Sequence, residues 1–88
     1  MERSVARKFR DGKMVKVWVK SDGGSIKEIR ITGDFFAHPE EGIELIEREL
    51  RDVKIVEVRR ALESASGGIT LIGVSIEDLI DMIEECLE

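Results

Sequence analysis

The sequence predicts an α+β domain of two layers, in which a three-stranded antiparallel meander is packed on one face by three helices. Two observations support this class. The first third of the chain alternates apolar and polar residues between turn residues, which is typical of strands, and the remainder repeats apolar residues at helical spacing. Strands grouped before helices favour helices on one face of an antiparallel sheet. The 88 residues are expected to form one domain spanning 1–88.

The three strands are expected in order along the first third of the chain. Val5–Arg10 and Lys13–Lys20 are joined at Asp11-Gly12, a pair that favours the positive φ angles of a tight hairpin turn. A second turn at Ser21–Ser25 leads into a third strand at Ile26–Thr32. The order of these segments predicts a meander.

The second and third strands each have an apolar and a polar face, because successive side chains point to opposite sides of a sheet. The face expected under the helices holds Val15, Val17, Val19, Ile29 and Ile31. The open face holds Lys16, Trp18, Lys20, Glu28 and Arg30. Trp and Arg are enriched among interface hot spots, so Lys16, Trp18, Lys20 and Arg30 form a candidate docking face. The alternative is that Trp18 only shields neighbouring strands.

Three helices are expected after the strands. The first begins at His38–Glu41, where a proline suits the first helical position and acids suit the helix dipole. The second ends at Gly67-Gly68, and the third begins at Ser75, with Asp78 completing a capping box. Their apolar faces comprise Ile43, Ile46 and Leu50; Val58, Ala61, Leu62 and Ala65; and Ile76, Leu79, Ile80, Ile83 and Leu87. The apolar connector Ile69–Ile72 fits either a helix or a strand.

Charge divides the chain into two unlike parts. Residues 1–33 carry nine basic and four acidic residues, whereas residues 34–88 carry five basic and fifteen acidic ones, for a net charge of −5. Charged residues make up 38% of the sequence, and Asn and Gln are absent, a tendency of thermophile proteins. A single cysteine, Cys86, cannot form an internal disulfide, and no segment is apolar enough for a signal peptide or membrane span. We therefore expect a cytoplasmic protein.

No catalytic or metal-binding constellation is recognisable in the sequence. The single histidine, His38, is interpreted as a capping or surface residue. The sequence has no second histidine that could act as a base for a serine or cysteine nucleophile. A Walker-type phosphate loop is absent, and soft metal ligands are too few. We predict no catalytic residues and no metal site in this chain.

The segment that joins the third strand to the first helix is unusual. Gly33 permits a rare backbone turn, and Asp34 can accept hydrogen bonds from nearby amides. Phe35 and Phe36 are adjacent, so in extended chain one is expected to face the core and the other a surface. The simplest reading is a structural corner pinned by aromatics. The alternative is a partner- or substrate-proximal site at Gly33, Asp34, Phe35 and Phe36.

Two motifs give the chain a family resemblance. The first runs from Gly12-Lys13-Met14-Val15 through Ile26–Phe36 to Pro39-Glu40-Glu41, and the second is Ile72–Leu79. Together they resemble the C-terminal domain of lipoate–protein ligases. The segment Asp52–Ile69 does not contribute to this resemblance.

The resemblance implies a function that the residues alone do not show. In this family a large catalytic domain binds ATP, Mg and lipoate, forms lipoyl-adenylate, and transfers lipoyl to a lysine of a carrier protein. In archaeal members the small domain is a separate chain needed for adenylation. We therefore expect a non-catalytic accessory subunit that binds no cofactor alone, forms a heterodimer with the catalytic subunit, and contacts lipoyl carriers.

Two other function classes remain open. The basic sheet face suits a phosphate- or nucleic-acid-binding module, although the few aromatics disfavour base stacking. The fold class is also similar to that of iron–sulfur scaffold proteins, which need several loop cysteines that this sequence does not offer.

Overall fold

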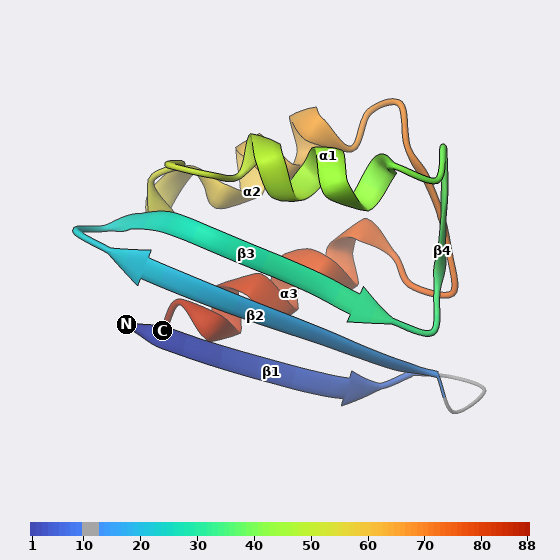
Figure 1. The fold of residues 1–88 in the computed structure, drawn as a ribbon, viewed down its shortest axis with the longest axis horizontal. Helices are drawn as coiled ribbons and strands as arrows, with labels where there is room; N and C mark the ends of the chain where they lie inside the picture. The colour runs from blue at the N-terminus through green and yellow to red at the C-terminus, as the bar shows by residue number, and fades with distance from the viewer. Residues whose placement is uncertain (10–12) are drawn as a thin grey trace.

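The first three strands form one antiparallel sheet, as predicted. The computed structural model describes residues 1–9 and 13–88. Strands β1 (Glu2–Lys8), β2 (Met14–Asp22) and β3 (Ser25–Gly33) lie in the order β1-β2-β3 (Figure 1). Gly23 and Gly24 close the β2–β3 turn with φ angles of +60° and +81°, a conformation open to glycine at little cost. The predicted Asp11-Gly12 turn lies outside the described residues.

The alternation along β2 and β3 places the apolar side chains as expected. Val15, Val17, Val19, Ile29 and Ile31 are all buried in the core. Trp18 lies on the opposite face, directly across from Ser4 of β1 and Arg30 of β3. The sheet therefore has one covered face and one open face.

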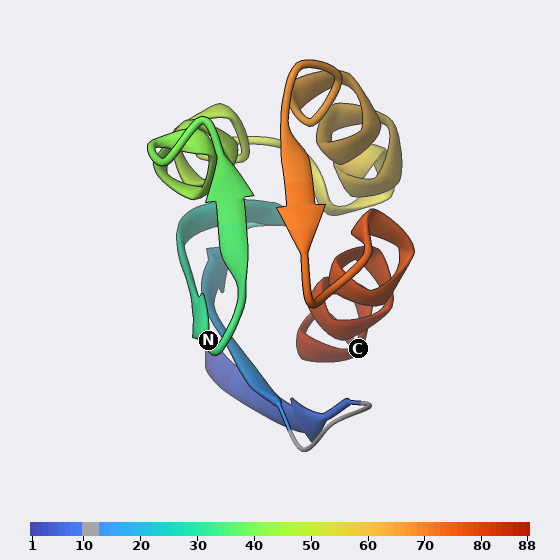
Figure 2. The same ribbon diagram turned by 90° about the vertical axis from the view of Figure 1, so that its right-hand side faces the viewer.

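Three helices cover the apolar face of the sheet. They are α1 (Gly42–Glu49), α2 (Val58–Ala65), which the short 3₁₀ turn η2 (Ile55–Glu57) precedes, and α3 (Ile76–Cys86). Helix α3 packs on β1 and β2, α1 packs on β3, and α2 packs against both of these helices (Figures 1 and 2). This arrangement confirms the α+β class with strands first and helices on one face.

The third helix starts where the capping box predicts. Ser75 Oγ accepts a hydrogen bond from the Asp78 N–H at 3.0 Å, and the Asp78 carboxylate accepts one from the Ser75 N–H at 3.1 Å. The helix buries Leu79, Ile80 and Ile83, and it also buries two residues outside the predicted stripe, Met82 and Cys86. The capping box thus gives hydrogen-bond partners to the Ser75 and Asp78 N–H groups, which have none within the helix.

The predicted start of the first helix is wrong. Residues Phe36–His38 form a short strand, β4, which pairs antiparallel with Thr70–Ile72, the strand β5. The chain then turns, and α1 begins only at Gly42, whose N–H donates to the Pro39 carbonyl at 2.9 Å. Strand pairing has thus replaced the local preference of His38–Glu41 for a helix start. Of the connector Ile69–Ile72, the last three residues form a strand.

Both outer edges of the main sheet are tied to other segments. On β3, the Ile31 N–H donates to the Glu47 carboxylate of α1 at 2.7 Å, and the Ile26 N–H donates to the Val53 carbonyl at 2.9 Å. On β1, Arg7 forms an ion pair of 2.7 Å with Glu85 of α3. The two hydrogen bonds pair backbone donors on the β3 edge, so fewer unpaired groups there are open to another chain. The contact of β1 with α3 joins side chains only.

Candidate functional site

The corner at Gly33 and Asp34 rigidly connects the end of β3 to the start of β2. Gly33 has a φ of +153°, and a Cβ there would lie 2.9 Å from the Cα of Val15 and closer still to the carbonyl oxygen of Met14. The Asp34 N–H donates to that carbonyl at 2.9 Å, and the Asp34 carboxylate accepts from the Met14 N–H at 3.2 Å. Only glycine fits the first position, and Asp34 pairs with Met14 through backbone and side chain.

The two phenylalanines that follow face opposite ways, as expected. Phe35 is half-buried and packs against the core, whereas Phe36 is 67% exposed. Gly73, which has a φ of +101°, lies beside Phe35. A Cβ added to Gly73 would lie 3.4 Å from the Phe35 Cβ. Phe35 thus helps to hold the corner, and Phe36 is presented to solvent.

Strands β4 and β5 form a two-stranded ribbon that stands across one end of the molecule (Figures 1 and 2). Ala37 and Leu71 pair on its inner face and are half-buried. The outer face of the ribbon consists of two cross-strand pairs, Phe36 with Ile72 and His38 with Thr70, all exposed. The ribbon therefore presents a small surface with an apolar pair beside a polar one.

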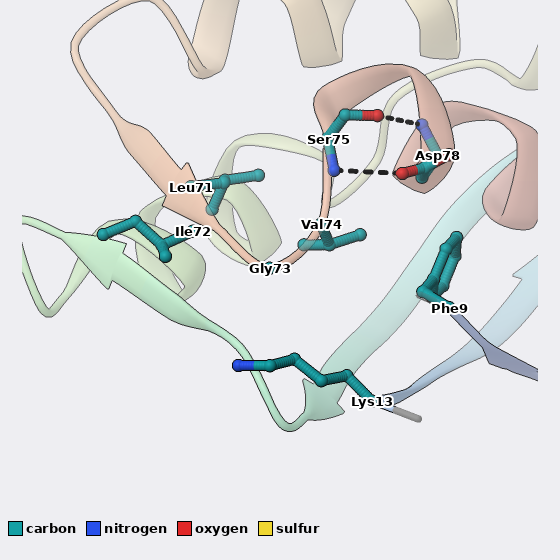
Figure 3. Close-up of a pocket in the computed structure, with 8 residues that line it drawn as sticks. All are labelled: Phe9, Lys13, Leu71, Ile72, Gly73, Val74, Ser75 and Asp78. Atoms are coloured by element: carbon teal, nitrogen blue, oxygen red, sulfur yellow. Dashed lines mark hydrogen bonds between the residues drawn. The ribbon is translucent and has the colours of Figure 1, made fainter. Parts of the chain in front are cut away.

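Two hollows adjoin the ribbon. One is lined in part by Phe9, Lys13, Leu71, Gly73 and Ser75, and Figure 3 shows Leu71 and Ile72 pointing to opposite sides of β5. The other is lined in part by Thr32, Gly33, Phe35, Phe36 and Ile43. The Lys13 Nζ lies 6.0 Å from the centre of the Phe36 ring, at the outer limit of a cation–π contact. The corner thus lies between two concave surfaces.

The basic face lies on the open side of the sheet, apart from the helices. Lys16, Trp18 and Lys20 alternate along β2, and Trp18 is half-buried between its cross-strand neighbours. Arg30 forms an ion pair of 2.6 Å with Glu28 on its own strand, which reduces the positive charge that the face offers. The structure therefore places these four residues on one side of the sheet, with Arg30 ion-paired, and their role in docking stays a prediction.

The predicted candidates fall into two groups. Gly33, Asp34, Phe35 and Phe36 belong to the corner and ribbon, and Lys16, Trp18, Lys20 and Arg30 belong to the basic face. Sequence analysis missed Ile72 and Lys13 as neighbours of Phe36. The exposed pair Thr70 and Ile72, alternating with Leu71, was the available signal, but three residues are too few to establish a strand.

Three further features of the described residues concern metal binding, membrane spanning and the cysteine thiol. Among residues 1–9 and 13–88, no three or more His, Cys, Asp or Glu side chains lie where they could hold a metal ion together. Within the same ranges, no helix is long and apolar enough to span a membrane. Cys86 is buried in α3, its Sγ lies 3.6 Å from the Val17 carbonyl oxygen, and burial raises the pKa of its thiol.

The fold and its surfaces define a small α+β domain in which a meander, three helices and a terminal ribbon present a corner and a basic face. The chain belongs to the family described as the bacterial lipoate protein ligase C-terminus, which matches residues 1–83. The predicted family is confirmed.

Two matches from Thermoplasma acidophilum agree with this assignment. The chain is 34% identical over 71 residues to the protein named lipoate-protein ligase A subunit 2, a match that covers 80% of this chain and 76% of the relative. A solved structure of an archaeal lipoylation system, described as a bi-partite lipoate protein ligase and its E2 lipoyl domain, contains a similar fold. That chain has a TM-score of 0.78 and 29% identity, and the match covers 94% of this chain and 97% of that one.

Proposed function

We propose that this chain is the accessory subunit of a two-component lipoate–protein ligase. It acts with a separate catalytic chain in the ATP-dependent activation of lipoate to lipoyl-adenylate, before lipoyl is transferred to a carrier lysine. The observation that carries this proposal is the similarity to a component of a bi-partite ligase over 94% of this chain and 97% of that chain. ATP, Mg²⁺ and lipoate are proposed to bind the catalytic chain.

The proposed role is to complete the site of the partner. A docked subunit can order loops and exclude water, and both effects strengthen the electrostatic interactions that hold phosphates and a reacting acyl group. The preformed corner and ribbon support this role, because a rigid element loses little conformational freedom on binding. The accessory chain should therefore act mainly on the adenylation step.

The test separates the two half-reactions. Lipoate-dependent release of pyrophosphate from ATP, which accompanies formation of lipoyl-adenylate, is measured with the catalytic chain of the same organism, with this chain, and with both together. Transfer is measured separately from preformed lipoyl-adenylate to a lipoyl carrier domain. We expect no activity from this chain alone and a larger stimulation of adenylation than of transfer.

Each departure from this pattern has a definite meaning. Adenylate formation by the pure isolated chain would contradict its non-catalytic role. Equal stimulation of both half-reactions would contradict the proposed step. A catalytic chain that neither binds this chain nor responds to it would refute the accessory function.

A further inference from the structure

The outer face of the β4–β5 ribbon exposes more apolar surface than the fold requires. Phe36 is 67% exposed and its cross-strand partner Ile72 is 57% exposed. The inner face of the ribbon, with Ala37 and Leu71, already supplies its attachment to the body of the domain. A single exposed apolar residue needs no explanation, but two that lie directly opposite each other form a contiguous patch.

The backbone that presents this patch is fixed at both strands. Before β4, Gly33 adopts a φ of +153° and Asp34 is hydrogen-bonded to Met14. After β5, Gly73 adopts a φ of +101° beside Phe35. A patch held in one arrangement before binding loses less entropy when a partner docks. The geometry is therefore suited to recognition by a surface of fixed shape.

We propose that the outer face of the ribbon, centred on Phe36 and Ile72, is the surface through which this chain binds the catalytic chain of the ligase. This inference rests on the accessory function proposed above. Phe36 is the aromatic anchor, Ile72 extends the apolar centre, and His38, Thr70 and Lys13 form a polar rim. An apolar centre within a polar rim is the common anatomy of protein interfaces.

The area that a stable interface requires extends beyond the outer face of the ribbon. Each partner in a stable complex contributes about 800 Å², roughly a seventh of the 5379 Å² that this chain exposes. The four side chains of the outer face are too few, because an interface uses about 20–30 residues a side. The hollows on either side of the ribbon supply adjoining concave surface, which a rigid partner surface would fill.

The chemistry of the patch favours a lasting partner over a transient one. Interfaces of permanent complexes are more apolar, and charged residues are depleted at their centres. The Phe36–Ile72 pair meets this description, whereas a carrier domain that visits once per turnover requires only a weak encounter surface. The catalytic chain is therefore the partner that the ribbon fits.

The experiment measures affinity of ribbon variants for the catalytic chain by titration calorimetry. The double variant Phe36→Ala with Ile72→Thr should weaken binding at least about 30-fold, as loss of an anchor residue typically does. Val56→Ala is the matched control, because Val56 is 89% exposed on η2, which contacts the β2–β3 turn at the opposite end of β3 from Gly33. The control should bind within about threefold of the wild-type chain.

A second measurement keeps the inference testable if the double variant loses stability. A photo-crosslinking amino acid placed at position 36 should form a covalent product with the catalytic chain, because that side chain is already exposed to solvent. Wild-type affinity in the double variant, or crosslinking only to the carrier domain or to neither protein, would overturn the docking surface. The accessory function would survive that result if the wild-type chain still binds, and would fail if it does not.

Discussion

Replacing Gly33 by alanine should be far more damaging than replacing Gly23 or Gly68. The new Cβ would lie 2.9 Å from the Val15 Cα and closer to the Met14 carbonyl oxygen, in a backbone conformation that side chains rarely adopt. Backbone strain of this kind costs about 1–3 kcal/mol. Moving the chain away breaks the hydrogen bond from the Asp34 N–H to Met14, which is worth about 1 kcal/mol. We expect a loss of about 2–4 kcal/mol.

Thermal unfolding followed by circular dichroism measures this loss. A domain of 88 residues has an unfolding entropy near 0.18 kcal/mol/K, so the Tm of Gly33→Ala should fall by about 10–20 °C. Two controls separate the causes. Gly23→Ala has a positive φ but no atom within 4 Å of the new Cβ, and should lose only about 1 kcal/mol. Gly68→Ala has neither feature and should be neutral or slightly stabilising.

The comparison can refute the reasoning directly. If Gly33→Ala unfolds at the same temperature as Gly23→Ala, the close approach of Met14 and Val15 contributes nothing and the corner is not rigid. If it unfolds at the temperature of Gly68→Ala, the backbone conformation is not strained for alanine either.

Three further outcomes follow from other parts of the structure. Trp18→Ala should weaken binding of a lipoyl carrier by about 2 kcal/mol while barely changing the Tm. Unchanged calorimetric affinity for the carrier would reject the basic face as a docking surface. Ser75→Ala should lower the free energy of unfolding by about 1 kcal/mol, or the Tm by about 5 °C, because the Asp78 N–H loses its hydrogen bond to the Ser75 side chain. The control Ser66→Ala loses only a hydrogen bond to the Glu63 carbonyl and should change the Tm less. Burial raises the pKa of Cys86, so the folded state holds the thiol proton more tightly than the unfolded state. The contribution of Cys86 to the free energy of unfolding should therefore be constant below the ordinary thiol value of 9.0 and fall at higher pH. Denaturant titrations should show that fall in the wild-type chain and a smaller one in Cys86→Ala.

The sequence by itself determined those features that depend on local pattern. Alternation placed Val15, Val17 and Val19 in the core and Trp18 on the open face, because the two-residue period of a strand fixes which side each residue takes. The capping box at Ser75 was also predictable, since its hydrogen bonds join residues only three apart. Motifs of this local kind were sufficient to identify the family.

Only the tertiary structure decided which distant segments meet. Phe36–His38 is a strand because it pairs with Thr70–Ile72, and three residues are too short to have a recognisable period of their own. That pairing overrode the local helix-start signal at Pro39 and moved the start of α1 to Gly42. It also placed Ile72 opposite Phe36, and packing brought Lys13 beside the same ring. A local pattern specifies a strand or helix and its buried face, but the neighbours of an exposed side chain depend on contacts between segments far apart in the chain.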